Sequence, residues 1–161
     1  MSGTGTPATL ALTQAHVPYT VHTYEHDPAV QDFGREAARV LGFDPLRVFK
    51  TLIVATGAGR PGLAVGIVPV AGSLDLKAMA RALGVKKVDL TDPKTAENSS
   101  GYIVGGISPI AQKTPLPTVL DETADLFDTI LVSGGRRGLD IELAPADLLR
   151  VTGGVLADIA R

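Results

Sequence analysis

Cysteine and tryptophan are absent from this 161-residue sequence, and aromatic residues are scarce, with three tyrosines and four phenylalanines. Without cysteine the chain can form no disulfide, no thiolate metal site and no cysteine nucleophile of its own. This composition suits a reducing compartment. So few rings also disfavour an aromatic platform on which nucleic-acid bases would stack.

A strong net charge is missing too, because fifteen basic and seventeen acidic residues leave a formal charge of −2. A generic nucleic-acid coat would be strongly basic, so we expect no DNA partner. A small basic patch on a near-neutral surface is still compatible with this balance. Any contact with RNA would have to come from such a patch.

Long hydrophobic runs are also lacking. The most apolar stretch, residues 63–72, is about half the roughly 20 residues that a membrane-spanning helix needs, and it contains Pro69. No basic residue precedes Arg35, so the start of the chain lacks the charged region of a secretory signal. We therefore expect a cytoplasmic protein with no membrane partner.

The hydrophobic content of 45% is enough for a substantial core. No repeat, linker or charge block divides the chain, so we expect a single domain over residues 1–161. Apolar spacing, caps and glycine stops predict helices at 6–16, 33–42, 73–84, 91–101 and from Pro145. Alternation and β-forming residues predict strands at 19–25, 49–55, 63–70, 85–90, 102–104, 117–120, 129–133 and 139–143.

The order of these elements favours an α+β fold. Strict alternation of strand and helix is absent, because the segments 49–70 and 129–143 each predict a hairpin. We therefore predict a mixed β-sheet that is curled into a barrel and flanked by helices.

Lys50 is the first residue that suggests a functional site. On a strand it shares one face with Leu52 and Val54, and both faces of that strand are otherwise nearly apolar. An ammonium group among such neighbours is costly unless it is paired. The alternative is that Lys50 lies at the strand end, where its head group reaches water.

His22, Tyr24 and His26 would share one strand face. Two histidines four positions apart suit a metal ion on a helix, but on a strand they lie roughly 13 Å apart. We therefore predict no metal site. These rings either line a pocket or cover a solvent-facing surface, and their spacing does not decide between the two.

Two glycine-rich segments follow strands. Gly105 and Gly106 let backbone N–H groups approach a developing oxyanion or a ribose oxygen, unless they form only a tight turn. Residues 133–138 predict a hairpin turn with exposed arginines and match neither a phosphate-binding nor a dinucleotide-binding loop. Asp140, just beyond this turn, either belongs to a solvated strand edge or holds a substrate ammonium group.

A Ser/His/Asp triad could be assembled on paper from Ser108 or Ser133, the three histidines and Asp140. The G-x-S-x-G elbow that presents such a serine is missing, so we disfavour this arrangement. No protein thiol or obvious general base takes its place.

Five segments occur in an order that is specific in combination. They are residues 22–28 (HTYEHDP), 49–52 (FKTL), 101–109 (GYIVGGISP), 132–140 (VSGGRRGLD) and 142–148 (ELAPADL). With these segments the chain resembles the YbaK family of aminoacyl-tRNA deacylases, in its Cys-tRNA(Pro) deacylase branch, which is related to the editing domain of prolyl-tRNA synthetase. The resemblance extends over nearly the whole chain.

The resemblance implies a freestanding editing enzyme that clears Cys-tRNA(Pro), with Cys-tRNA(Cys) as a candidate second substrate, and that needs no cofactor and no metal. It implies tRNA(Pro) as the nucleic-acid partner and prolyl-tRNA synthetase as a candidate protein partner. The family fold is a mixed β-barrel flanked by helices. Ala111 stands where relatives often have glycine, and Thr114 stands where a second lysine usually follows Lys113.

The same resemblance assigns site residues. Those expected to form the catalytic pocket are Tyr24, Lys50, Gly105, Ser133 and Asp140. Those expected to bind the substrate are Thr51, Gly106, Ile107 and Ser108. Those expected to contact tRNA are Lys86, Lys87, Lys113, Arg136 and Arg137.

The mechanism that the resemblance implies fits a chain without cysteine. The thiol of the substrate's own cysteine attacks its ester carbonyl and releases a cyclic thiolactone and free tRNA. The amides of Gly105 and Gly106 are candidate oxyanion donors, and Lys50 either adds charge there or orients the 3′-terminal adenosine. Two other functions stay open: a hydrolytic deacylase of Ala-tRNA(Pro) or another small aminoacyl-tRNA, and a non-catalytic module that binds tRNA or a synthetase.

Overall fold

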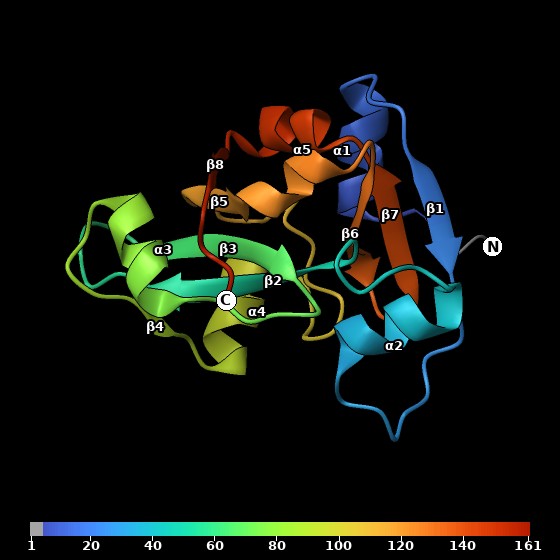
Figure 1. Cartoon of the computed structure of the whole chain (residues 1–161), viewed down its shortest axis with the longest axis horizontal. Coiled ribbons are helices and arrows are strands. Elements are labelled where there is room, and N and C mark those ends of the chain that lie inside the picture. Colours follow the sequence, from blue (N-terminus) through green and yellow to red (C-terminus); the bar gives the residue numbers. More distant parts are fainter. Residues whose placement is uncertain (1–4) are drawn as a thin grey trace.

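The computed structural model describes residues 5–161, whose strands form two sheets (Figure 1). The smaller sheet is antiparallel and has the order β1-β7-β6; its strands are β1 (Thr20–Thr23), β6 (Ile130–Arg136) and β7 (Leu139–Leu143). The larger sheet has the order β4-β2-β3-β5-β8; its strands are β2 (Phe49–Ala55), β3 (Leu63–Pro69), β4 (Asp89–Leu90), β5 (Thr118–Asp121) and β8 (Val155–Ala157). It is mixed, because β3–β5 and β5–β8 pair in parallel while β2 pairs antiparallel with both neighbours.

Helices surround the sheets in Figure 1. They are α1 (Pro7–Gln14), α2 (Phe33–Leu41), α3 (Leu76–Leu83), α4 (Pro93–Ser100), the 3₁₀ helix η1 (Glu122–Leu126) and α5 (Pro145–Thr152). All but η1 fall in predicted helical ranges. α3 begins three residues after the predicted start at residue 73, where Asp75 caps it: the Asp75 carboxylate accepts the Ala78 N–H over 3.1 Å. None of the helices within residues 5–161 is long and apolar enough to span a membrane.

The two sheets do not close into a barrel, so this part of the predicted fold is wrong. They meet along a short seam, where Val48, just before β2, forms a parallel bridge to Leu131 in β6. The Leu131 N–H donates to the Arg47 carbonyl oxygen over 3.1 Å. From this seam β2 continues beside β3 and β6 continues beside β7, so the sheets diverge. The coarser prediction, an α+β fold with a mixed sheet, is confirmed.

Three strand predictions also differ from the structure, and in one of them the predicted strand at 85–90 is reduced to the two residues of β4. Residues 102–104 form no strand, because Tyr102 turns into the core and its hydroxyl donates to the Ile110 carbonyl oxygen over 2.7 Å. β8 forms where the sequence shows only a short apolar tail. Three residues are too few to show an alternating pattern, and pairing with β5 decides their conformation.

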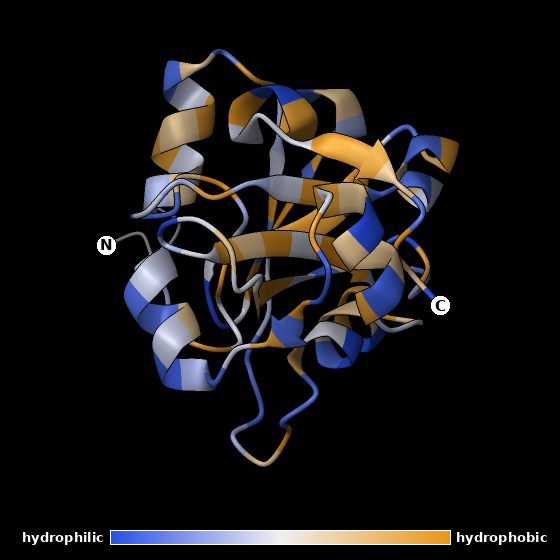
Figure 2. Cartoon of the chain, turned by 90° about the vertical axis from the view of Figure 1, so that its left-hand side faces the viewer, coloured by the Kyte–Doolittle hydropathy of each residue, from blue (hydrophilic) through white to orange (hydrophobic). Residues whose placement is uncertain are grey.

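Alternation along the strands separates an apolar from a polar face. In β7, Leu139, Ile141 and Leu143 are buried in the core, whereas Asp140 and Glu142 point to the opposite face. Figure 2 shows the same division, with largely orange strands inside and helices of mixed colour around them. The polar face of the smaller sheet is therefore free to form a site.

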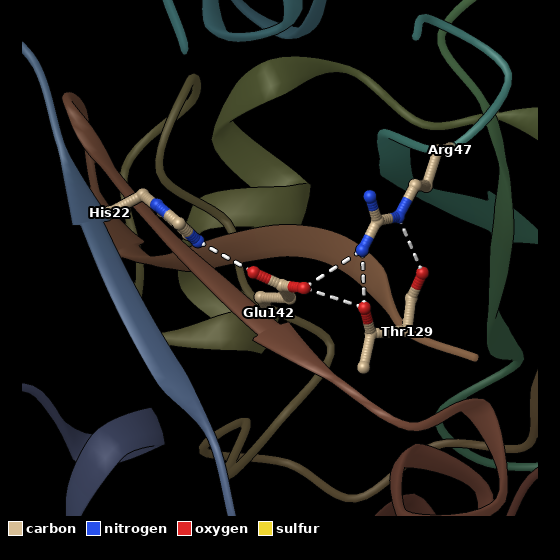
Figure 3. A network of polar contacts seen from close by, with 4 residues as sticks. All are labelled: His22, Arg47, Thr129 and Glu142. Atoms are coloured by element: carbon tan, nitrogen blue, oxygen red, sulfur yellow. Dashed lines mark hydrogen bonds and ion pairs between the residues drawn. The ribbon is translucent and has the colours of Figure 1, made fainter. Parts of the chain in front are cut away.

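A polar network on that face joins the smaller sheet to the chain just before β2 (Figure 3). The Glu142 carboxylate accepts hydrogen bonds from the Thr129 hydroxyl over 2.6 Å and from Arg47 over 2.8 Å. Its other oxygen contacts His22 Nε2 over 2.8 Å. Arg47 also lies over the Phe43 ring, 5.0 Å from its centre. The hydrogen bonds from Thr129 and His22 hold the pKa of Glu142 below its usual value.

We expect the substitution Arg47→Ala to destabilise the protein, because it removes the charged donor that joins Glu142 to the segment before β2. Loss of a hydrogen bond to a charged group costs roughly 1.5–3 kcal/mol. Since a lowered pKa gives stability that is lost as the pH falls through it, the difference from wild type should shrink in acid. Thermal unfolding at pH 7 and pH 4 measures both effects.

The matched control is Arg150→Ala, which removes an exposed pair at 3.5 Å from Asp147. Such surface pairs contribute about 0–1 kcal/mol. Equal losses for the two variants at pH 7 would show that the seam network does not hold the sheets together.

Candidate active site

A cavity of about 380 Å³ lies where the two sheets diverge. Its walls come from β2, from the N-terminal half of α2, from the segment between β4 and α4, and from the polar face of β6 and β7. Ligand sites usually measure about 300–1,000 Å³, so this cavity suits a small ligand or one end of a larger one.

All five residues expected to form the catalytic pocket line this single cavity: Tyr24, Lys50, Gly105, Ser133 and Asp140. The pairing of β6 with β7 sets Ser133 directly opposite Asp140, and β1 sets His22 opposite Asp140 on the other side. The chain then leads past His22 to Tyr24, whose N–H donates to the Gly138 carbonyl oxygen over 2.9 Å. Residues far apart in the sequence are thus brought together by sheet register.

The four residues expected to bind the substrate divide into two groups. Thr51 and Ile107 line the cavity. Gly106 and Ser108 lie outside its lining. The Gly106 N–H already donates to the Ile103 carbonyl oxygen over 2.8 Å, and the buried Ser108 hydroxyl accepts the Ile110 N–H over 3.2 Å. The structure gives both of these residues a role in shaping the loop.

Asp140 is buried without a partner. Only 6% of its surface is exposed, and burial raises its pKa to about 7. Within residues 5–161 no group donates a hydrogen bond to its carboxylate. It does not belong to a solvated strand edge, because β7 lies between β1 and β6. An acid held in this state, in a cavity, is typical of a functional site.

Two further side chains present hydrogen-bond donors to the cavity. Lys50 is half-buried, and its ammonium group forms no ion pair within residues 5–161. Burial, followed by the charges of Asp140 and Glu36, raises the pKa of Tyr24 to about 12. The Tyr24 hydroxyl therefore keeps its proton at neutral pH.

Gly105 brings its backbone to the cavity wall. Its φ of +90° is in the region that favours glycine, and a Cβ there would lie 2.7 Å from the Phe33 ring. In the part of the chain that the structure describes, the Gly105 N–H has no acceptor. This amide is therefore available to a ligand in the cavity.

No histidine lines the cavity within residues 5–161. His22 binds Glu142, and His26 Nδ1 contacts the buried Glu36 over 2.6 Å. Ser133 accepts only a long hydrogen bond, 3.5 Å, from the Gly135 N–H. The geometry therefore gives no support to a triad in which histidine activates Ser133.

Sequence reasoning missed the wall that α2 and the β4–α4 segment contribute, including Phe33, Gly34, Thr91 and Pro93. Gly34 carries the one signal that the sequence offered, since a glycine within a helix often marks close packing. A Cβ at this position would clash with Val70. The helix therefore lies close against the end of β3.

Of the basic residues expected to contact tRNA, none lines the cavity within residues 5–161, but one touches its wall. Arg137 contacts two residues of the cavity wall, since its guanidinium lies 4.9 Å from the centre of the Phe33 ring and donates to the Val104 carbonyl oxygen over 2.9 Å. Phe33 and Val104 both line the cavity. The remaining residues of this group lie outside the lining, in loops for Lys86, Lys87 and Lys113 and at the end of β6 for Arg136.

We expect Asp140→Asn to stabilise the fold at pH 8. The folded-state pKa of Asp140 lies above its usual value of 3.8, so the ionised carboxylate costs stability progressively as the pH rises from about 4 to about 7. The asparagine variant avoids this cost, and its melting temperature at pH 8 should exceed that of wild type by several degrees. At pH 4 the two proteins should melt at similar temperatures.

Circular dichroism melts at the two pH values measure this effect, with Asp128→Asn at an exposed position as the control. A stabilisation that is the same at pH 4 and pH 8 would mean that ionisation of Asp140 is not its cause.

Comparison with known proteins identifies the family of this chain. The chain matches the family described as the aminoacyl-tRNA editing domain over residues 27–151. It is 41% identical over 155 residues to EbsC of Enterococcus faecalis, named as a candidate Cys-tRNA(Pro)/Cys-tRNA(Cys) deacylase, with 96% of this chain and 92% of that protein covered.

Two solved structures have the same fold. A candidate trans-editing enzyme for prolyl-tRNA synthetase superposes with a TM-score of 0.81 at 25% identity, covering 100% of this chain and 99% of that one. The hypothetical protein APE2540 superposes with a TM-score of 0.86 at 25% identity, covering 97% and 100%. Because the family match spans most of the chain and the relative at 41% identity nearly all of it, this protein belongs to the aminoacyl-tRNA editing family, as its resemblance to YbaK-type proteins indicated.

Proposed function

We propose that this protein is a freestanding deacylase that clears cysteine from mischarged tRNA(Pro), with Cys-tRNA(Cys) as a second substrate. The family and the name of its relative EbsC support this function. The observation that carries it is the content of the cavity. Among residues 5–161, it is lined by an unpaired cation, an unpaired buried acid and an unused backbone N–H, but by no thiol and no histidine.

Asp140 is suited to bind the α-ammonium group of the esterified amino acid. Burial raises the pKa of the carboxylate to about 7 by disfavouring its charged form, and a cation bound beside it would offset that cost. The cavity volume of about 380 Å³ accommodates an aminoacyl group together with part of the terminal nucleoside. Binding at Asp140 would then set the ester between β7 and the loop that contains Gly105.

The reaction requires no nucleophile from the protein. The substrate's thiol sulfur attacks the ester carbonyl carbon, and a C–S bond forms as the C–O bond to the ribose breaks. The thiol proton leaves to water, the ribose oxygen takes up a proton, and the products are a cyclic thiolactone and free tRNA. Well-oriented intramolecular attack corresponds to an effective molarity on the order of 10⁵–10⁸ M.

The described residues stabilise the charge that develops in this step. The Gly105 N–H and the Lys50 ammonium are the donors for the oxyanion. The hydroxyls of Tyr24 and Ser133 lie in the same cavity and are available to the leaving ribose oxygen. Tyr24 is suited to this because its pKa, raised to about 12, keeps it protonated.

The tRNA is held by few basic side chains on a protein with a net charge of −2. Arg137 at the cavity mouth is the candidate for the acceptor end, and the other four, Lys86, Lys87, Lys113 and Arg136, for more distant phosphates. Each neutralised phosphate adds about 0.7–0.9 to the slope of log affinity against log salt concentration. Because so few basic side chains are available to neutralise phosphates, we expect weak binding with a shallow slope. Prolyl-tRNA synthetase, which holds the same tRNA, is the partner that would supplement it.

We expect Lys50→Ala to lower the rate of Cys-tRNA(Pro) deacylation by about 10²–10³-fold, the usual effect of removing one oxyanion donor. A fall in kcat assigns Lys50 to the oxyanion, and a rise in KM alone assigns it to the adenosine. Lys77→Ala, on the exposed side of α3, is the control. Both roles are contradicted if the Lys50→Ala protein is folded and keeps more than about half of the wild-type rate.

We also expect deacylation to depend on the substrate's thiol. Cysteine, serine and alanine are too similar in size for a small pocket to separate them strongly by binding alone. If the thiol is the nucleophile, S-methylation of Cys-tRNA(Pro) abolishes release of tRNA, and mass spectrometry detects the thiolactone from the unmodified substrate. Cleavage of the methylated substrate at a similar rate would instead identify a positioned water, and with it a small-residue hydrolase.

A further inference from the structure

One edge of β2 is unpaired along the cavity. On one side β2 pairs with β3 over its whole length, from Phe49 to Ala55. On the other side β4 reaches only Val54 and Ala55, and the bridge to β6 lies before the strand, at Val48. Between these two contacts no strand within residues 5–161 covers β2.

The cavity touches β2 along this open edge. Five consecutive residues, 49–53, line the cavity. Side chains of consecutive strand residues point to opposite faces of a sheet, so one face alone could not supply all five. A ligand in the cavity therefore lies beside the strand, approximately in the plane of the sheet.

The direction of the backbone groups follows from contacts at the two ends. The Val48 carbonyl oxygen accepts the Val70 N–H over 2.8 Å, on the β3 side. The Ile53 carbonyl oxygen accepts the Thr91 N–H over 3.1 Å, on the opposite side. The backbone groups of successive strand residues point to alternate sides of the strand. The N–H and the carbonyl group of Thr51, two residues before Ile53, therefore both point away from β3.

Thr51 thus faces the cavity with three unpaired polar groups. Its backbone N–H and carbonyl lie on the open edge, and its hydroxyl is buried with no hydrogen-bond partner within residues 5–161. Buried polar groups are almost always hydrogen-bonded in a native structure. The arrangement indicates a ligand that offers both a donor and an acceptor beside β2.

We propose that the open edge of β2 binds the adenine base of the 3′-terminal adenosine. The Thr51 N–H donates to ring atom N1, and an adjacent outward carbonyl of the same edge accepts from the N6 amino group. The flat base lies in the plane of the sheet, between apolar side chains that line the cavity, among them Phe33, Leu90 and Pro93. This inference rests on the proposed function, which supplies the nucleotide.

Adenine is favoured over the aminoacyl group by the position of Thr51 along the strand. Asp140 and Ser133 lie toward the seam with β6, where the aminoacyl group is proposed to bind. Thr51 is further along β2, toward Thr91 and the start of α4. A nucleoside that is attached to the ester and remains in the cavity must therefore extend from the seam toward Thr51 and the start of α4.

The test removes one hydrogen-bonding atom from each partner. Cys-tRNA(Pro) carrying 1-deazaadenosine at its 3′ end lacks N1, and we expect its KM to rise about tenfold with kcat unchanged. An amide-to-ester replacement at Thr51 deletes only the N–H, and it should raise KM for normal substrate by the same factor. When the Thr51 ester is combined with the 1-deazaadenosine substrate, we expect no further rise in KM, because both changes remove the same contact.

The matched control is the ester at Leu52, whose N–H points toward β3. It should lower the melting temperature but preserve the tenfold effect of 1-deazaadenosine. If the effects of the Thr51 ester and of 1-deazaadenosine multiply, or if 1-deazaadenosine is cleared normally, the base does not bind Thr51. Failure of wild-type protein to clear unmodified Cys-tRNA(Pro) would instead contradict the proposed function.

A second measurement does not depend on activity or on the ester variant. Free adenosine titrated into ¹⁵N-labelled protein should shift the Thr51 amide resonance, and 1-deazaadenosine should not. Equal shifts from the two nucleosides, or none from either at saturating concentration, would overturn the assignment.

Discussion

The short contact between β2 and β6 is the constraint on which the site depends. At Val48 and Leu131 the sheets are joined backbone to backbone, and beside this bridge Glu142 ties Arg47 to the smaller sheet. Beyond the seam the strands diverge, because each continues with its own hairpin partner. The cavity is the space that this divergence leaves. A closed barrel would have paired the edge of β2 and removed it.

The cavity holds its polar groups at a cost to stability. In the part of the chain that the structure describes, Asp140 is buried without a donor and the hydroxyl of Thr51 is buried without a partner. Lys50 and Asp140 line the same space and do not neutralise each other in an ion pair. Substrate would satisfy these groups, and in the free protein they are held in place by the sheets. Such pre-organised charge is the usual source of catalytic electrostatic stabilisation.

Several features of the site could be predicted from the sequence. Alternation in β7 separated Asp140 from Leu139 and Ile141, and a lysine on an apolar strand singled out Lys50. The resemblance to editing proteins grouped these residues with Gly105, and all three line one cavity. Local patterns sufficed here because each depends on one strand or one turn.

Other features depend on contacts between distant segments and were not predictable in this way. The barrel prediction failed because strand patterns do not specify which edges remain unpaired. The contribution of Phe33 depends on α2 packing against Val70, at the end of β3. The open edge of β2 follows only from the register of three other strands.

The central claim is that the cavity at the seam binds the aminoacyl end of tRNA. A crystal structure with a stable analogue, in which cysteine is joined to the 3′ position of adenosine by an amide, tests it directly. The α-ammonium group should contact the Asp140 carboxylate, and the carbonyl oxygen should lie about 2.7–3.1 Å from the Gly105 N–H. An analogue bound elsewhere on the protein, or bound here with its amino acid directed away from Asp140, would contradict the account.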